Sequence, residues 1–183
     1  MHHRSVVTAL SVLAAVAGPS ALRAQSSEKP SAFQVTGGAM FPVFSYADAT
    51  KGTGWTAGAA FVLQRGYSYH VRLEGEYNTV GSEVGSGKFD TYGGGVGGGR
   101  VFARSSSVRQ EAYFVAGGYE FKGQVCTGGA SCADHSELQF GTKVGGNAVF
   151  GHGKAKFVLD FHWLYTWSQP YVNILAITGG LRF

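Results

Sequence analysis

The last eleven residues of the chain, 173–183, alternate between two kinds of side chain. Counting back in twos from Phe183 gives one face made of Leu181, Gly179, Ile177 and Leu175. The residues between them are polar or small, namely Arg182, Gly180, Thr178 and Ala176. A period of two is that of a β-strand, whose successive side chains point to opposite faces. The chain is therefore expected to end in a strand with one apolar face and an aromatic last residue.

Seven earlier segments show the same alternation and raise the predicted number of strands to eight. They are residues 32–43, 55–64, 69–80, 91–103, 112–122, 138–150 and 155–166. The last of them alternates most clearly, with Leu159, Phe161 and Trp163 on either side of Asp160 and His162. The segment 91–103 is the weakest prediction, because glycines occupy both of its faces.

The predicted connections alternate between long and short. Residues 44–54, 81–90 and 123–137 form the long ones, and residues 65–68, 104–111 and 151–154 form mostly tighter ones. Long connections at one end and tight turns at the other are typical of an up-and-down barrel. The fold prediction is therefore all-β: an eight-stranded antiparallel up-and-down transmembrane β-barrel, with both chain ends at the side of the tight turns.

Composition and aromatic placement are the reasons for placing this barrel in a membrane. The chain has 29 glycines and only 14% charged residues, which suits a transmembrane barrel. The alternative is a soluble lipocalin-like barrel, with apolar residues inside and polar residues outside, and alternation alone does not separate the two. Aromatic residues predicted at both rims favour the membrane. One rim would hold Phe33, Tyr69, Phe102, Tyr113, Phe150, Phe157 and Phe183, and the other Phe41, Trp55, Tyr77, Tyr92, Tyr119, Phe140, Trp163, Tyr165 and Tyr171.

The first 24 residues have the layout of a secretory signal peptide. A positive start precedes a mostly apolar run from Val6 to Ala17, and small residues lead to a cut after Ala24. That run is well short of the ~20 residues that a spanning helix needs, so a retained anchor is the less favoured alternative. Residues 25–183 then form one barrel domain, with strands from about residue 32 to 183. Loss of Arg4 and Arg23 lowers the net charge from +4 to +2, so no nucleic-acid partner is expected.

The alternation, the turn pattern and the terminal Phe183 make residues 32–183 resemble the small eight-stranded outer-membrane barrels of the OmpA, OmpX and opacity-protein type. The resemblance implies the outer membrane of a Gram-negative bacterium, with lipid and lipopolysaccharide around a monomeric barrel. In that family a terminal phenylalanine is part of the signal read by the barrel-assembly machinery, the role expected of Phe183. Members include anchors, adhesins, narrow channels and a few lipid-modifying enzymes, so the resemblance is specific for fold and poor for function.

Polar side chains on the predicted strands are expected to form a network in the barrel lumen. Facing lipid, an Arg or Lys would cost up to about 2–4 kcal/mol near the midplane, whereas inside an eight-stranded barrel such groups can pair and fill the space. A structural plug of mixed charge is the main prediction, and a polar conduit or gate is the alternative. The predicted network is Arg72, Glu74, Glu76, Glu120, Lys143, Lys156, Asp160, His162 and Arg182.

Cys126 and Cys132 are predicted to form a disulfide in the longest outer connection. Two cysteines in an exported protein are expected to be oxidised. The five residues between them let the chain turn back within the ~4.4–6.8 Å Cα separation that a disulfide needs. No metal site is expected, because only His135 adds a soft ligand nearby, and no cofactor is predicted.

Three patterns that could indicate enzymatic chemistry are weak. Residues 93–99 contain G-x-G-x-x-G, but that fingerprint needs a following helix, so a smooth glycine-rich strand is predicted instead. His135 and Ser136 tend to point apart on a strand, and Asp160 and His162 share a face that projects into the lumen. No enzyme is therefore predicted.

The expected function is that of a non-enzymatic outer-membrane barrel with surface-exposed loops, serving envelope integrity, adhesion or another surface interaction. A small channel or porin for small or apolar solutes is the alternative. A lipid A-modifying enzyme is a third and less favoured possibility.

Overall fold

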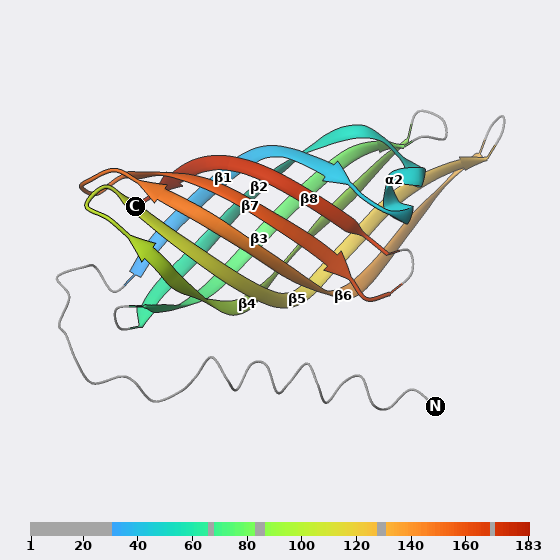
Figure 1. Cartoon of the computed structure of the whole chain (residues 1–183). Coiled ribbons are helices and arrows are strands. Elements are labelled where there is room, and N and C mark those ends of the chain that lie inside the picture. The colour runs from blue at the N-terminus through green and yellow to red at the C-terminus, as the bar shows by residue number, and fades with distance from the viewer. Residues whose placement is uncertain (1–30, 66–67, 83–86, 128–130, 169–170) are drawn as a thin grey trace, which may run out of the picture.

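The computed structural model describes residues 31–65, 68–82, 87–127, 131–168 and 171–183. The predicted signal peptide lies outside these residues. The elements are β1 (Ser31–Pro42), α2 (Ser45–Ala49), β2 (Thr50–Arg65), β3 (Tyr69–Ser82), β4 (Lys88–Arg104), β5 (Val108–Thr127), β6 (Ser131–Phe150), β7 (Lys156–Thr166) and β8 (Asn173–Arg182). Each strand pairs antiparallel with the next, and β8 pairs with β1 to close the barrel (Figure 1). The predicted fold class is confirmed.

The barrel has two differently built ends. At the terminal mouth lie the C-terminus and the tight connections β2–β3, β4–β5 and β6–β7. At the distal mouth lie the connections β1–β2, β3–β4, β5–β6 and β7–β8, together with α2 (Figure 1). The connections alternate between the two ends because consecutive strands run in opposite directions.

The strands are longer at the distal mouth than the alternation predicted. The predicted connection 123–137 is largely a hairpin of β5 and β6, which stay paired out to Thr127 and Ser131. The pairing of β5 with β4 ends at Gly123, and that of β6 with β7 begins at Gly141. The distal part of the β5–β6 hairpin therefore rises beyond its neighbours. It escaped prediction because it lacks the apolar face that marks a strand in the barrel wall.

The barrel wall carries apolar side chains outside and polar side chains inside. Phe61, Leu73 and Leu159 point outward and are 45%, 58% and 47% exposed. In contrast, Arg72 and Asp160 point inward and are buried. A soluble barrel would show the opposite arrangement, so the lipocalin-like alternative is wrong. An outward apolar surface on a closed barrel is what a bilayer requires. Among the described elements, no helix is long and apolar enough to cross a membrane.

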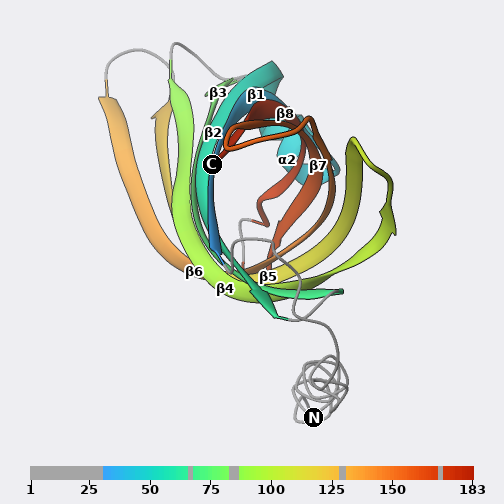
Figure 2. The same cartoon turned by 90° about the vertical axis from the view of Figure 1, so that its left-hand side faces the viewer.

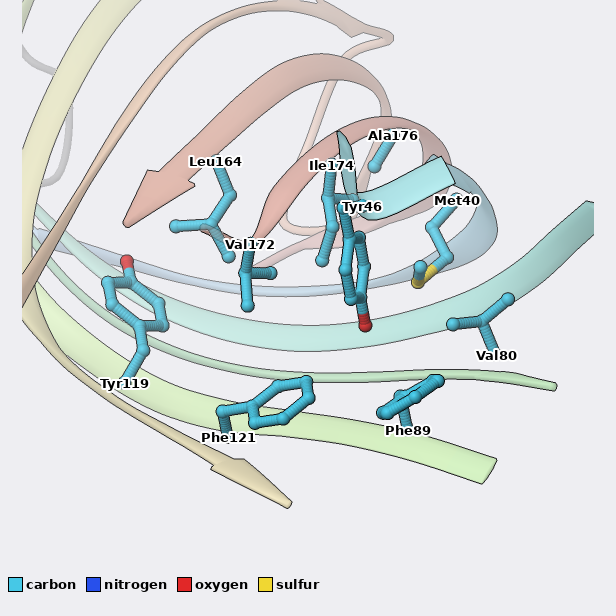
Figure 3. Packing of buried hydrophobic residues seen from close by; sticks show 10 residues of the cluster. All are labelled: Met40, Tyr46, Val80, Phe89, Tyr119, Phe121, Leu164, Val172, Ile174 and Ala176. Atoms are coloured by element: carbon cyan, nitrogen blue, oxygen red, sulfur yellow. The ribbon is translucent and has the colours of Figure 1, made fainter. Parts of the chain in front are cut away.

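The short helix α2 closes the interior at the distal mouth. It lies within residues 44–54, for which the sequence predicts only a connection. Phe44 precedes it with φ 56°, a conformation that a bulky residue rarely adopts, and the chain then turns inward. Tyr46 packs edge-on against Phe89 and Phe121, with ring centroids 6.2 and 6.3 Å away. Burial raises the pKa of the Tyr46 hydroxyl, which stays neutral. This apolar plug consists of Met40, Tyr46, Val80, Phe89, Tyr119, Phe121, Leu164, Val172, Ile174 and Ala176 (Figure 3).

Candidate functional site

A network of charged side chains fills the middle of the barrel, below the apolar plug. These residues alternate with the outward apolar residues on β3, β6 and β7, so the two-residue period of each strand places them all in the lumen. Each is less than a tenth exposed. The central network consists of Arg72, Glu74 and Glu76 of β3, Tyr113 of β5, Lys143 of β6, and Asp160 and His162 of β7.

Lys143 joins the two glutamates of β3 across the lumen. Its Nζ lies 2.5 Å from Glu76 Oε2 and also pairs with Glu74. Arg72 Nε donates to Glu74 Oε2 at 2.5 Å. Asn78 Nδ2 donates to the other Glu76 oxygen at 2.7 Å. Each buried carboxylate of β3 therefore has a cation beside it, as a charge removed from water requires.

Asp160 and His162 extend this network to β5. Asp160 Oδ1 lies 2.7 Å from His162 Nδ1, and the Tyr113 hydroxyl donates to both Asp160 oxygens at 3.0 and 2.9 Å. The other ring nitrogen of His162 lies 3.1 Å from Glu76. Arg72 stacks over the Tyr113 ring, with its Cζ 4.2 Å from the centroid. Four strands are thus connected through side chains.

Glycines provide the space for these inward rings. A Cβ on Gly145 would lie 2.6 Å from the Tyr113 ring and 2.8 Å from His162 Cβ. A Cβ on Gly99 would lie 2.5 Å from the His70 ring, and one on Gly93 would lie 2.9 Å from the Tyr119 ring, besides backbone contacts that are closer still. The glycine-rich run of β4 therefore acts as the smooth strand that the sequence predicted.

A second network lies nearer the terminal mouth, and its central residue was missed. Glu111 is 0% exposed and accepts from both terminal guanidinium nitrogens of Arg182, Nη1 and Nη2, at 2.9 Å. Arg109 also pairs with Glu111 and donates to Gln64 at 2.7 Å. Arg182 Nη2 donates to Gln34 at 2.8 Å. Glu111 was assigned to a connection, although it lies in phase with Tyr113 on the inward face of β5.

The structure buries seven of the nine predicted lumen residues inside the barrel: Arg72, Glu74, Glu76, Lys143, Asp160, His162 and Arg182. Lys156 lies half-buried at the terminal mouth. Glu120 differs from the prediction, because it lies on the outer face, where it accepts from the Ser136 hydroxyl at 2.7 Å and faces Lys122 at 3.5 Å.

The misplacement of Glu120 comes from an inverted assignment of the faces of β5. Tyr113 and Tyr119 were expected on the outer rims, but they point inward and are 3% and 1% exposed. A shift of one residue exchanges the two faces of a strand. Treating tyrosine as an apolar residue assigns Tyr113 to the outer face. Its ring instead points into the barrel, where its hydroxyl donates to Asp160.

The side chains of the two groupings considered for catalysis are paired with carboxylates. His162 lies between Asp160 and Glu76. Ser136 donates to Glu120, while His135 lies 3.5 Å from Glu137. Among the described residues, no group of three or more histidine, cysteine, aspartate or glutamate side chains is arranged so that it could hold a metal ion.

Cys126 and Cys132 are opposite each other in the β5–β6 hairpin; their side chains lie outside the described part of the chain, so the disulfide stays a prediction. Directly opposed residues of an antiparallel pair have Cα atoms about 4.5–5.5 Å apart, which a disulfide can bridge. Mass spectrometry of the thiol-blocked, non-reduced chain should show a peptide that links the two cysteines. Free thiols at both positions would contradict it.

Phe183 lies at the terminal mouth and extends the pairing of β8 with β1. Its amide donates to the Phe33 carbonyl at 2.8 Å, and the Phe33 amide donates back at 3.2 Å. The side chain is 53% exposed on the outer face. Its expected role in assembly remains a prediction.

Solved outer-membrane proteins share this architecture. Neisserial surface protein A (NspA) superposes with a TM-score of 0.64 at 13% identity, over 84% of this chain and 96% of that one. A major outer membrane protein from Thermus thermophilus gives 0.59 at 15%, over 85% and 99%. Ail, the attachment invasion locus protein of Yersinia pestis, gives 0.52 at 15%, over 85% and 100%. No protein-family model matches the sequence, and no curated protein matches it. The chain therefore has the fold of the small eight-stranded outer-membrane β-barrels.

Proposed function

We propose that this chain is an integral outer-membrane protein that acts through its outer surface, in envelope integrity or adhesion, rather than as a channel or an enzyme. The barrel would be an anchor, and the distal β5–β6 hairpin would be the part that meets partners. The observation that carries the proposal is that the interior is filled over most of its length.

Successive layers of side chains occupy the lumen between its mouths. The central network leaves a cavity of about 10 Å³ beside Lys143, Asp160 and His162, roughly the space of one water molecule. Above it, Tyr46 and its neighbours form an apolar layer across the distal mouth (Figure 3). A solute would have to break buried ion pairs and then displace aromatic rings. This packing argues against the alternative of a small channel.

The distal hairpin supports a role at the surface. Asp134, His135, Ser136 and Leu138 are exposed on β6 beyond the point where β7 stops pairing, and Leu138 is 76% exposed. NspA is described as a surface protein and Ail as an attachment invasion locus protein. A protruding hairpin on a filled barrel supports a similar role in contacts at the cell surface here.

An epitope tag inserted at residues 128–130 should be labelled by antibody on intact cells. The same tag at residues 105–107, in a tight turn of the terminal mouth, should be labelled only after the outer membrane is permeabilised. The purified protein should give no discrete conductance steps in planar bilayers. Labelling of the second tag on intact cells would show that the terminal mouth faces the outside of the cell. Regular conductance steps would favour the channel.

A further inference from the structure

A pocket at the terminal mouth has no part in the anchoring role. It has a volume of about 260 Å³ and opens at the end of the barrel that faces the viewer in Figure 2. Four cationic side chains line it: Arg109, Lys154, Lys156 and Arg182. No aspartate or glutamate of the described residues is among its lining. The pocket therefore presents positive charge to the compartment at this end.

The two arginines form the fixed base of the pocket. Both pair with the buried Glu111, which accepts from Arg182 at 2.9 Å. Arg182 also donates to the side-chain oxygen of Gln34, whose Nε2 is buried without a hydrogen-bond acceptor in the described part of the chain. The base thus has more donors than acceptors.

The two lysines are the charges that remain uncompensated. No carboxylate of the described residues lies within ion-pair distance of Lys154 or Lys156. Glu111 is the one acidic side chain of the described residues that pairs with the arginines at the base of the pocket. Among the described residues, the two arginines therefore share one carboxylate, and the two lysines have none.

The charged residues of the barrel are also distributed unevenly between its two mouths, with the excess of positive charge at the terminal mouth. Among the described residues near the terminal mouth, the only acidic side chain is Glu111, and the basic ones are Arg65, Arg100, Arg104, Arg109, Lys154, Lys156 and Arg182. Near the distal mouth the described acidic residues are Asp48, Asp90, Glu120, Asp134 and Glu137, against Lys51, Lys88 and Lys122. Summed charges of one sign in a concave mouth raise the local concentration of the opposite ion.

We propose that this pocket binds a small phosphate-bearing anion. A phosphate group carries about −1.5 to −2 charges at neutral pH and has three acceptor oxygens, which matches two lysines that no described carboxylate neutralises. Lys154 and Lys156 contact the phosphate, and the paired arginines hold the base of the pocket in place. The walls include the buried, inward-facing Val62 and Val149, so the pocket lies inside the barrel mouth and not on the outer apolar surface.

The test uses the mature chain in nanodiscs of phosphatidylcholine, titrated with inorganic phosphate and glycerol 3-phosphate by calorimetry. Saturable binding is expected, and Lys154→Gln with Lys156→Gln should weaken it about tenfold or more, or ~1.4 kcal/mol. The matched control replaces Lys51 and Lys88 of the distal mouth with glutamine and should leave binding unchanged. Heat-modifiable migration verifies that both double variants are folded.

A second set of nanodiscs contains phosphatidylglycerol and identifies the source of the phosphate. Weaker binding of inorganic phosphate in these discs would show that a lipid headgroup occupies the same site. Unchanged binding would identify a soluble ligand. The proposal is overturned if the unmodified chain shows no saturable binding, or if the two double variants lose affinity equally.

Discussion

Replacing Lys143 with methionine is expected to lower the free energy of unfolding by about 3–5 kcal/mol, the cost of leaving a buried charge without its partner. Lys143 is 4% exposed and pairs with both Glu74 and Glu76. Arg72 pairs with Glu74, so Glu76 would lose its permanent cation. Urea unfolding of the barrel in lipid vesicles, followed by tryptophan fluorescence, measures the change.

Two further variants make this result specific. Lys122→Met removes another strand lysine, whose side chain is 52% exposed and lies 3.5 Å from Glu120; it should change the stability by less than about 0.5 kcal/mol. Adding Glu76→Gln to Lys143→Met should recover part of the loss, with a coupling energy of about 0.5–3 kcal/mol. Full stability of Lys143→Met alone would show that the central network does not hold the barrel together.

The strand number and most of the inward faces could be predicted, because a barrel wall forces a two-residue alternation. His70, Arg72 and Glu74 show it well: each lies between outward apolar residues and each is buried. The same rule failed on β5, because Tyr113 has both an apolar ring and a hydroxyl that Asp160 requires. Side chains with two chemical characters do not identify their face.

The partners inside the lumen could not be predicted, because they depend on closure of the barrel. Glu111 and Arg182 are 71 residues apart and meet across the lumen. Lys143 and Glu76 are 67 residues apart. Nothing local in the sequence links them. The helix α2 could not be predicted for a different reason. Its five residues are too few to show a helical period, so the sequence does not indicate that Tyr46 points inward.

Replacing Phe161 with arginine should prevent most of the chain from reaching the folded, heat-modifiable form. Phe161 is 53% exposed on the outer face of β7, opposite Gly146 of β6 and Ile177 of β8. An arginine there would meet hydrocarbon, at a cost of about 2–4 kcal/mol near the midplane. Phe161→Leu keeps an apolar side chain and should fold close to normally.

The neighbouring position provides the comparison within the same strand. His162 is 3% exposed and lies between Asp160 and Glu76 in the lumen. Nitroxide labels on single cysteines, in a chain with Cys126 and Cys132 replaced by serine, report the surroundings of each position. A label at Phe161 should be accessible to oxygen dissolved in the bilayer, and a label at His162 should be shielded from it. If position 162 were lipid-accessible and position 161 shielded, the inner and outer faces of β7 would be exchanged. The outward apolar face of β7 would then no longer support the membrane assignment.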